Sequence, residues 1–297
     1  MEPAPQPVLS AGVPAPTSHT VDAGGLSLHV LQRGPDSASL NVVLLHGWLD
    51  HAHGFDWMAE QLPKTWRLFA LDFRGHGQSD PLPTGSSHQL TDHVADIEAL
   101  VRHFSLSSLH LVGHSLGGSV SICYAAARPE RIKSLSLIES LGSSGGEPAD
   151  CVERIRDFTQ GLFKPVRRRV YASVEEAAAR VAEANTSYSP AASRQMAQFG
   201  TLAVEGGVVF RADPRLKHTS GMTFDEAQVL ALCSAVQCPV QVIQGSRGML
   251  LDDAVMKGRM AALKNPRVTR VDGGHHVHLD QPSEVARLVE GFIAEVG

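Results

Sequence analysis

The sequence reads L-V-G-H-S-L-G-G from Leu111 to Gly118, an apolar run that ends in the pattern G-x-S-x-G. This pattern predicts a strand, a sharp turn and a helix, because glycines two residues on either side of the serine let the strand and helix pass close together. The turn lifts the Ser115 hydroxyl clear of the backbone. The helix directs its amino end to the same point, so the N–H of Leu116 favours an oxyanion there. Ser115 is therefore the candidate nucleophile and Leu116 a candidate oxyanion donor.

A second predicted strand, Asn41–Leu45, ends in the segment H-G-W-L-D. Its short, apolar and β-branched composition is typical of a strand buried on both faces. Gly47 directly after the strand lets the chain fold back over the sheet edge, so the N–H of Trp48 is the second candidate oxyanion donor. The side chain of Trp48 has two interpretations, as a wall of an acyl pocket or as a ring packed under its own loop.

Predicted strands and helices alternate along most of the chain. This alternation indicates an α/β fold, a mostly parallel central sheet with helices on both faces. The block 141–235 interrupts it and is predicted to be an inserted, mostly helical cap. The strands are expected at Leu26–Leu31 (an edge strand), Arg67–Leu71, Ser134–Glu139, Val240–Gln244 and Arg267–Val271. The helices are expected at Thr91–Phe104, after Ser115, near Val152–Phe163 and Val174–Ala184, near Asp253–Leu263 and at Ser283–Val296.

Composition excludes several classes of protein. The segment 1–18 holds five of the 17 prolines and is predicted to be a disordered tail, which leaves 19–140 and 236–297 as the core around the cap. A formal charge of −5 offers no basic footprint for nucleic acid, and no apolar run is long enough to span a membrane. Four cysteines without metal-ligand or C-x-x-C spacing are expected to be reduced thiols of a cytoplasmic protein. Oligomeric state is not indicated.

His275 is the candidate general base. It lies between two glycines and other histidines in the loop after a predicted strand, and ligands of parallel sheets bind beyond the carboxyl ends of the strands. A neutral imidazole can accept the serine proton and later donate it to the leaving group. His276 and His278 are the nearest rivals for this role.

Glu139 is the first candidate for the acid that orients the base. It ends the strand that follows the Ser115 unit, so the chain order is serine, carboxylate, histidine, as in some known triads. The alternative acid is Asp252, or its neighbour Asp253, in the loop after the next strand. Each has a simpler structural interpretation, since the aspartates can cap a helix and Glu139 can bind backbone amides.

No metal site or cofactor is predicted. Two H-x-H pairs, His51 with His53 and His276 with His278, have no third and fourth ligand at a recognisable spacing. In the loop that begins at Asp72, both Asp72 and Arg74 are expected to stabilise the loop rather than to bind substrate.

Several of these segments together resemble the α/β-hydrolase superfamily over nearly the whole chain after Ser18. The motifs are H-G-W at His46, D-F-R-G-H-G-Q-S at Asp72, G-H-S-L-G-G at Gly113 and G-G-H at Gly273. Within the superfamily, four segments resemble the serine hydrolase-like group: H-G-W-L-D at His46, L-I-E-S-L-G at Leu137, F-R-A-D-P-R-L at Phe210 and D-Q-P at Asp280.

The resemblance implies the triad roles assigned above, with one departure. Many members carry an aspartate three residues after the glycine that ends the strand before the last; here that glycine is Gly245 and the position is Gly248. Some relatives, including haloalkane dehalogenases, take a glutamate from the end of the preceding strand, which matches Glu139. Dehalogenases and epoxide hydrolases need an aspartate nucleophile, and Ser115 argues against both.

The expected function is that of a carboxylesterase-like serine hydrolase, which cleaves an ester or related acyl bond of a small molecule through an acyl-enzyme. Three alternatives stay open on the same scaffold. These are a carbon–carbon bond hydrolase, a cofactor-free haloperoxidase and a non-catalytic ligand-binding protein.

Overall fold

A twisted, mostly parallel sheet forms the centre of the molecule. The computed structural model describes residues 14–83, 85–185, 188–250 and 254–296. Within them the main sheet has eight strands in the order β1-β2-β4-β3-β5-β6-β9-β10. β2 pairs antiparallel with β1 and β4, and the other neighbours are parallel. The strands are Thr17–Asp22 (β1), Ser27–Arg33 (β2), Asn41–Leu45 (β3), Arg67–Leu71 (β4), Leu109–His114 (β5), Ile132–Ile138 (β6), Val240–Gly245 (β9) and Arg267–Val271 (β10).

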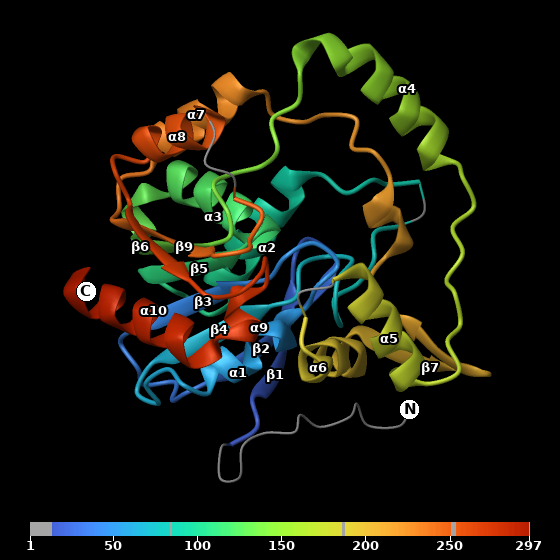
Figure 1. Cartoon of the computed structure of the whole chain (residues 1–297), viewed down its shortest axis with the longest axis horizontal. Coiled ribbons are helices and arrows are strands. Elements are labelled where there is room, and N and C mark those ends of the chain that lie inside the picture. Colours follow the sequence, from blue (N-terminus) through green and yellow to red (C-terminus); the bar gives the residue numbers. More distant parts are fainter. Residues whose placement is uncertain (1–13, 84, 186–187, 251–253, 297) are drawn as a thin grey trace.

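Helices cover both faces of this sheet, which confirms the predicted fold class (Figure 1). Each face packs its own apolar cluster against the strands, because side chains of a buried strand alternate between the two faces. One face carries α2 (Leu90–His103), α3 (Leu116–Ala127), α7 (Glu226–Ala235) and α8 (Ala254–Ala262). The other carries the short helices η1 (Ala52–Phe55) and α1 (Asp56–Ala59), then α9 (Val277–Asp280) and α10 (Pro282–Val296). A short turn of helix, η2 (Pro129–Arg131), precedes β6.

The junction of β5 and α3 requires glycine for close packing. A Cβ built on Gly113 would lie 2.5 Å from the carbonyl oxygen of Gly117, and one built on Gly117 would lie 2.0 Å from that of Leu45. Both distances are far below van der Waals contact. The G-x-S-x-G pattern therefore lets α3 pack directly on the backbone of β5 and β3.

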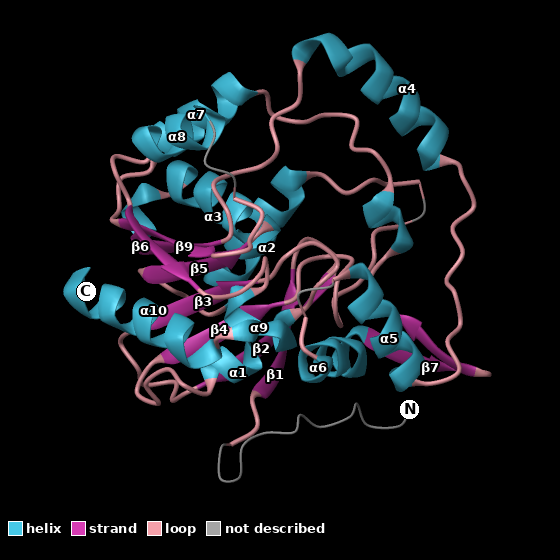
Figure 2. Ribbon diagram, viewed as in Figure 1, coloured by secondary structure: helices cyan, strands magenta, loops and turns pink. Residues whose placement is uncertain are grey.

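The segment between β6 and α7 lies beside the sheet (Figure 2). α5 packs against α6, and β7 pairs antiparallel with β8. α4 lies far from the sheet; of its residues, all of them described, only Gly161 is buried. The elements are η3 (Pro148–Asp150), α4 (Cys151–Leu162), α5 (Val174–Ala184), α6 (Pro190–Gly200), β7 (Thr201–Val204), β8 (Gly207–Phe210) and η4 (Pro214–Lys217).

The structure differs from the sequence-based boundaries at three points. Thr17 and Ser18 were expected in the tail but pair with β2 as the start of β1, so β1 rather than β2 is the edge strand. α7 was expected in the cap but packs on α3 and α8, where its Val229 and Cys233 join the core. The β7–β8 hairpin was not predicted. Among the described helices, none combines the length and apolar character needed to cross a bilayer.

Candidate active site

Ser115 occupies a strained turn between β5 and α3. Its backbone has φ 51° and ψ −114°, in a region that residues with a side chain rarely adopt. Such a conformation costs about 1–3 kcal/mol and persists where the surroundings enforce it. Here the Ser115 N–H donates to the carbonyl of Ile138 at 3.0 Å, at the end of the neighbouring strand. The segment after β3 lies against the turn, since a Cβ on Gly47 would meet Cβ of Ser115 at 3.3 Å.

Glu139 and His275 form a partly buried acid–base pair. Nδ1 of His275 lies 3.2 Å from Oε2 of Glu139, whose side chain is fully buried. The carboxylate also accepts backbone N–H groups from Gly245 at 2.7 Å and Met249 at 2.6 Å. Glu139 therefore does both things that the sequence suggested: it contacts the imidazole and it binds backbone amides. Its own φ of 49° is a second strained backbone in this region.

The His275 loop is held from two sides. The N–H of Gly274 donates to Oδ2 of Asp280 at 2.8 Å, and Nε2 of His114 donates to the carbonyl of His275 at 2.9 Å. The backbone of the candidate base is thus bonded to the residue that precedes Ser115. With Nδ1 directed to Glu139, Nε2 is the ring nitrogen left to exchange a proton with a hydroxyl. The sequence indicates Asp280 only through the D-Q-P motif.

The rival residues have other surroundings. Burial lowers the pKa of His276 to about 2 and that of His278 to about 3, so both imidazoles stay neutral at ordinary pH. Nδ1 of His276 and both ring nitrogens of His278 have no hydrogen-bond partner among the described residues, whereas Nδ1 of His275 contacts Glu139. The alternative acid Asp252, with Asp253, lies outside the described residues.

The two candidate oxyanion donors follow neighbouring strands. Leu116 is the first residue of α3, so its N–H belongs to the helix turn that has no intrahelical acceptor. Trp48 follows Gly47 in the segment that lies against Ser115. The indole of Trp48 is 52% exposed and donates from Nε1 to the carbonyl of Leu216 at 3.2 Å. Trp48 therefore contacts the segment between β6 and α7 instead of being buried under its own loop.

The loop after β4 is stabilised by its own charged residues, as predicted. Asp72 contacts Nδ1 of His29 at 2.8 Å and accepts the N–H of Gln78, within the loop, at 2.9 Å, and these contacts hold its pKa well below the ordinary value. Arg74 pairs with Asp96 at 2.6 Å.

The F-R-A-D-P-R-L motif has a structural role in the contact between the segment after β6 and the core. The N–H of Asp213 donates to the carbonyl of Gly75 at 2.7 Å, while its carboxylate contacts His88 at 3.2 Å and Arg215 at 2.7 Å. Arg215 in turn donates to the carbonyl of Pro83 at 2.7 Å. This motif holds the segment between β6 and α7 against the loop after β4.

A serine on a strained strand-to-helix turn, with a partly buried carboxylate–imidazole pair at the same sheet edge, is the arrangement found in α/β-hydrolase-fold proteins. The family model for the alpha/beta hydrolase fold matches residues 41–282, and the chain belongs to this family, within its serine hydrolase-like group.

Three relatives illustrate the similarity. The chain is 29% identical over 264 residues to a serine hydrolase-like protein of Danio rerio, covering 85% of this chain and 81% of that one. It is 30% identical over 229 residues to a pimeloyl-[acyl-carrier protein] methyl ester esterase of Chromobacterium violaceum, covering 75% and 79%. A crystal structure of a hypothetical protein from Pseudomonas aeruginosa matches with a TM-score of 0.87 and 31% identity over 93% of this chain and 99% of that one.

Proposed function

We propose that this protein hydrolyses carboxylic esters or closely related acyl bonds of small molecules through a covalent intermediate on Ser115. The contact between Nδ1 of His275 and Oε2 of Glu139, at 3.2 Å and next to the strained Ser115 turn, is the observation that carries the proposal. A buried carboxylate in this position fixes the tautomer of the imidazole and stabilises the imidazolium that forms during catalysis. The esterase named among the relatives supports the same reaction class.

In the proposed reaction, Oγ of Ser115 attacks the substrate carbonyl carbon while its proton passes to Nε2 of His275. The N–H groups of Trp48 and Leu116 stabilise the oxyanion of the tetrahedral intermediate. The intermediate collapses with cleavage of the acyl–oxygen bond, and the departing alcohol takes the proton from His275. Water then attacks the acyl-enzyme by the same route, which releases the acid and restores Ser115.

Covalent labelling by a fluorophosphonate probe tests this proposal. The probe reacts with a serine only where a base and an oxyanion site activate it, so we expect one adduct per chain by intact mass. The Ser115→Ala variant, confirmed as folded by circular dichroism, is expected to give none. Ser119→Ala is a matched control, because Ser119 lies one helix turn further along α3 and its hydroxyl contacts the Ser115 carbonyl at 3.4 Å. An unlabelled, folded wild-type chain would instead favour a non-catalytic ligand-binding protein.

A further inference from the structure

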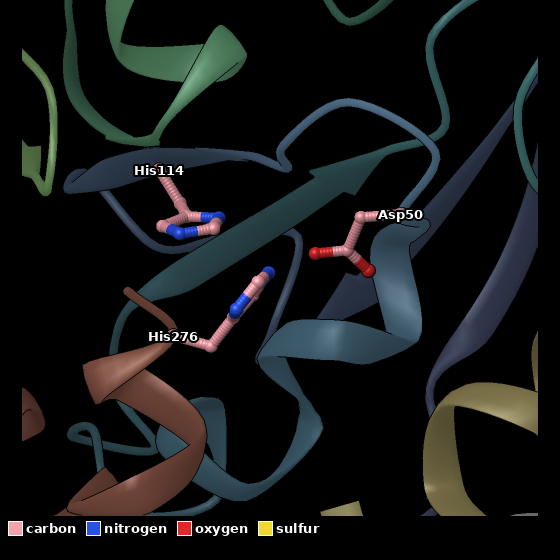
Figure 3. A group of neighbouring side chains, drawn as sticks. All are labelled: Asp50, His114 and His276. Atoms are coloured by element: carbon pink, nitrogen blue, oxygen red, sulfur yellow. The ribbon is translucent and has the colours of Figure 1, made fainter. Parts of the chain in front are cut away.

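Three potential metal ligands that are distant in the sequence lie together beside the candidate active site (Figure 3). Asp50 precedes η1, His114 is the last residue of β5, and His276 precedes α9. One possible ligand atom from each lies within 4.8 Å of the others. Asp50 and His114 are 4% and 0% exposed. The two H-x-H pairs in the sequence do not predict this cluster, because neither pair includes Asp50 or His114.

Two atoms of this cluster lack a hydrogen-bond partner. Oδ2 of Asp50 and Nδ1 of His114 are both buried and unpaired among the described residues. Figure 3 shows a carboxylate oxygen of Asp50 directed to the space between the two rings. A buried polar atom left unpaired costs about 1–3 kcal/mol, so two such atoms within one cluster of potential ligands indicate a bound species.

The hydrogen bonds around the cluster prepare it for a cation. Nε2 of His114 donates to the carbonyl of His275 at 2.9 Å, so Nδ1 of a neutral His114 carries only a lone pair. Metal-binding histidines are typically oriented by such a bond from the other ring nitrogen to a carbonyl. Oδ1 of Asp50 accepts the N–H of His51 at 2.6 Å, which leaves Oδ2 for a ligand.

We propose that Asp50, His114 and His276 bind one divalent transition-metal ion of the Zn²⁺ type. Two imidazoles and one carboxylate are a common protein ligand set for such ions. Bond lengths of about 2.0–2.1 Å in a tetrahedral site place ligand atoms roughly 3.3 Å apart, so modest side-chain rotation closes the present cluster around the ion.

The ion would link three segments that carry candidate catalytic groups. Asp50 lies two residues after Trp48, His114 directly precedes Ser115, and His276 directly follows His275. Its role is to hold these segments at fixed separation. Because it touches none of the reacting atoms, its binding does not depend on the proposed hydrolase function.

Metal titration of the full-length chain, first stripped with a chelator, tests the proposal. We expect one Co²⁺ per chain by visible absorbance and one Zn²⁺ by calorimetry, with a higher Tm in the presence of Zn²⁺. Asp50→Asn, which keeps the shape of the side chain, and His276→Asn are each expected to weaken binding at least tenfold. His110→Asn is the control: His110 is a buried histidine at the other end of β5, bonded to Ser134 at 2.8 Å, and its loss should leave metal affinity unchanged.

Two results would overturn the proposal. One is a stripped wild-type chain that binds neither Co²⁺ nor Zn²⁺ saturably. The other is metal affinity that stays unchanged in a folded Asp50→Asn variant, which would place the ion among other histidines. Fluorophosphonate labelling of Ser115 in the stripped chain is read separately, so failure of the metal site and failure of the hydrolase proposal are distinguishable.

Discussion

At the scale of single residues, Gly248 and Glu139 depend on each other. A Cβ built on Gly248 would lie 2.2 Å from Oε1 of Glu139, and the other two carboxyl atoms lie within 2.3 Å of it. A side chain at position 248 is therefore incompatible with the observed position of the carboxylate. Many α/β-hydrolases carry an aspartate at the position of Gly248. Here glycine at this position leaves room for the carboxylate of Glu139, which comes from the end of the preceding strand. This steric relation is the structural argument for Glu139 as the orienting carboxylate.

We therefore predict that Gly248→Ala lowers the reactivity of the Ser115 hydroxyl, although the substitution removes no polar group. The new methyl group displaces Glu139 from His275, and a displacement of about 1 Å costs on the order of 10²-fold in rate. Glu139→Gln is expected to lose more, on the order of 10³–10⁴-fold, because the amide cannot hold the imidazole in the same tautomer. The rate constant of fluorophosphonate labelling measures both.

Gly258→Ala is the matched control for the Gly248 prediction. A Cβ on Gly258, within α8, would meet only Cδ2 of Leu230, at an ordinary 3.9 Å. We expect its labelling rate to equal that of wild type. A Gly248→Ala chain that labels as fast as Gly258→Ala would show that Glu139 does not govern the reactivity of Ser115.

The sequence predicts the individual candidate catalytic residues better than it predicts the side chains that surround them. Ser115, Glu139 and His275 could be nominated because each lies at or shortly after the end of a predicted strand, and strand ends converge at one edge of a parallel sheet. The cluster of Asp50, His114 and His276 could not. His114 and His276 are the sequence neighbours of Ser115 and His275. The direction of a side chain in a turn depends on the backbone dihedral angles, and these cannot be read from the spacing of residues in the sequence.

At the scale of elements, the crossing of α3 over β3 and β5 controls stability. Gly117 is the point of closest approach, where a Cβ would lie 2.0 Å from the backbone oxygen of Leu45 and 2.8 Å from that of His46. Backbone atoms of a central strand cannot move aside as a flexible side chain does.

Gly117→Ala is therefore expected to destabilise the protein by about 3 kcal/mol or more, at the upper end of overpacking effects. Gly291→Ala, near the end of α10 with no atom within 4 Å of the new Cβ, is expected to stabilise by about 0.5–1 kcal/mol, since alanine favours the helix. Urea unfolding at pH 7.5 measures the free energy of unfolding of both variants. Equal midpoints for the two variants would contradict the close crossing of α3 and β3.

Elements with strong periodicity were predictable, and short ones were not. The helix expected at Val174–Ala184 matches α5, since its apolar positions recur at helical spacing. β1 escaped prediction because its sequence T-S-H-T-V-D buries only Val21, and it exists as a strand through pairing with β2. The β7–β8 hairpin has four residues in each strand, too few for an alternating pattern to stand out.

At the scale of the whole molecule, the segment between β6 and α7 is joined to the core by specific contacts. Met196 of α6 accepts a hydrogen bond from Nε2 of His51 at 3.0 Å, and Phe199 stacks on His53 with ring centroids 3.9 Å apart. The carbonyl of Leu216 accepts a hydrogen bond from the indole of Trp48. The end of this segment was hard to place from sequence, because α7 is a helix like its neighbours α5 and α6, and only its packing on α3 and α8 assigns it to the core.

The whole molecule also buries many uncharged histidines, and this predicts acid sensitivity. Burial lowers the pKa of His46 and of His110 to about 4, from about 6.5 in the unfolded chain. Between pH 6.5 and 4 the unfolded chain therefore binds more protons, and stability falls as pH falls. The raised pKa of Asp50, about 7, acts in the opposite direction and offsets roughly one histidine. The pKa values of His51, His76 and His278 are lowered as well, so the net slope keeps the sign of the histidines.

We expect the free energy of unfolding to decrease by about 1.4 kcal/mol per pH unit for each uncompensated buried histidine, on approach to pH 5. Urea unfolding at pH 7.5, 6.5, 5.5 and 5.0, with chelator present, measures this slope. His110→Asn removes one such group, which contacts Ser134 at 2.8 Å, so its curve should fall less steeply by up to the same amount. Stability that is constant or rises between pH 6.5 and 5 would mean that these imidazoles take up protons in the folded chain, which their enclosed positions in and beside the sheet argue against.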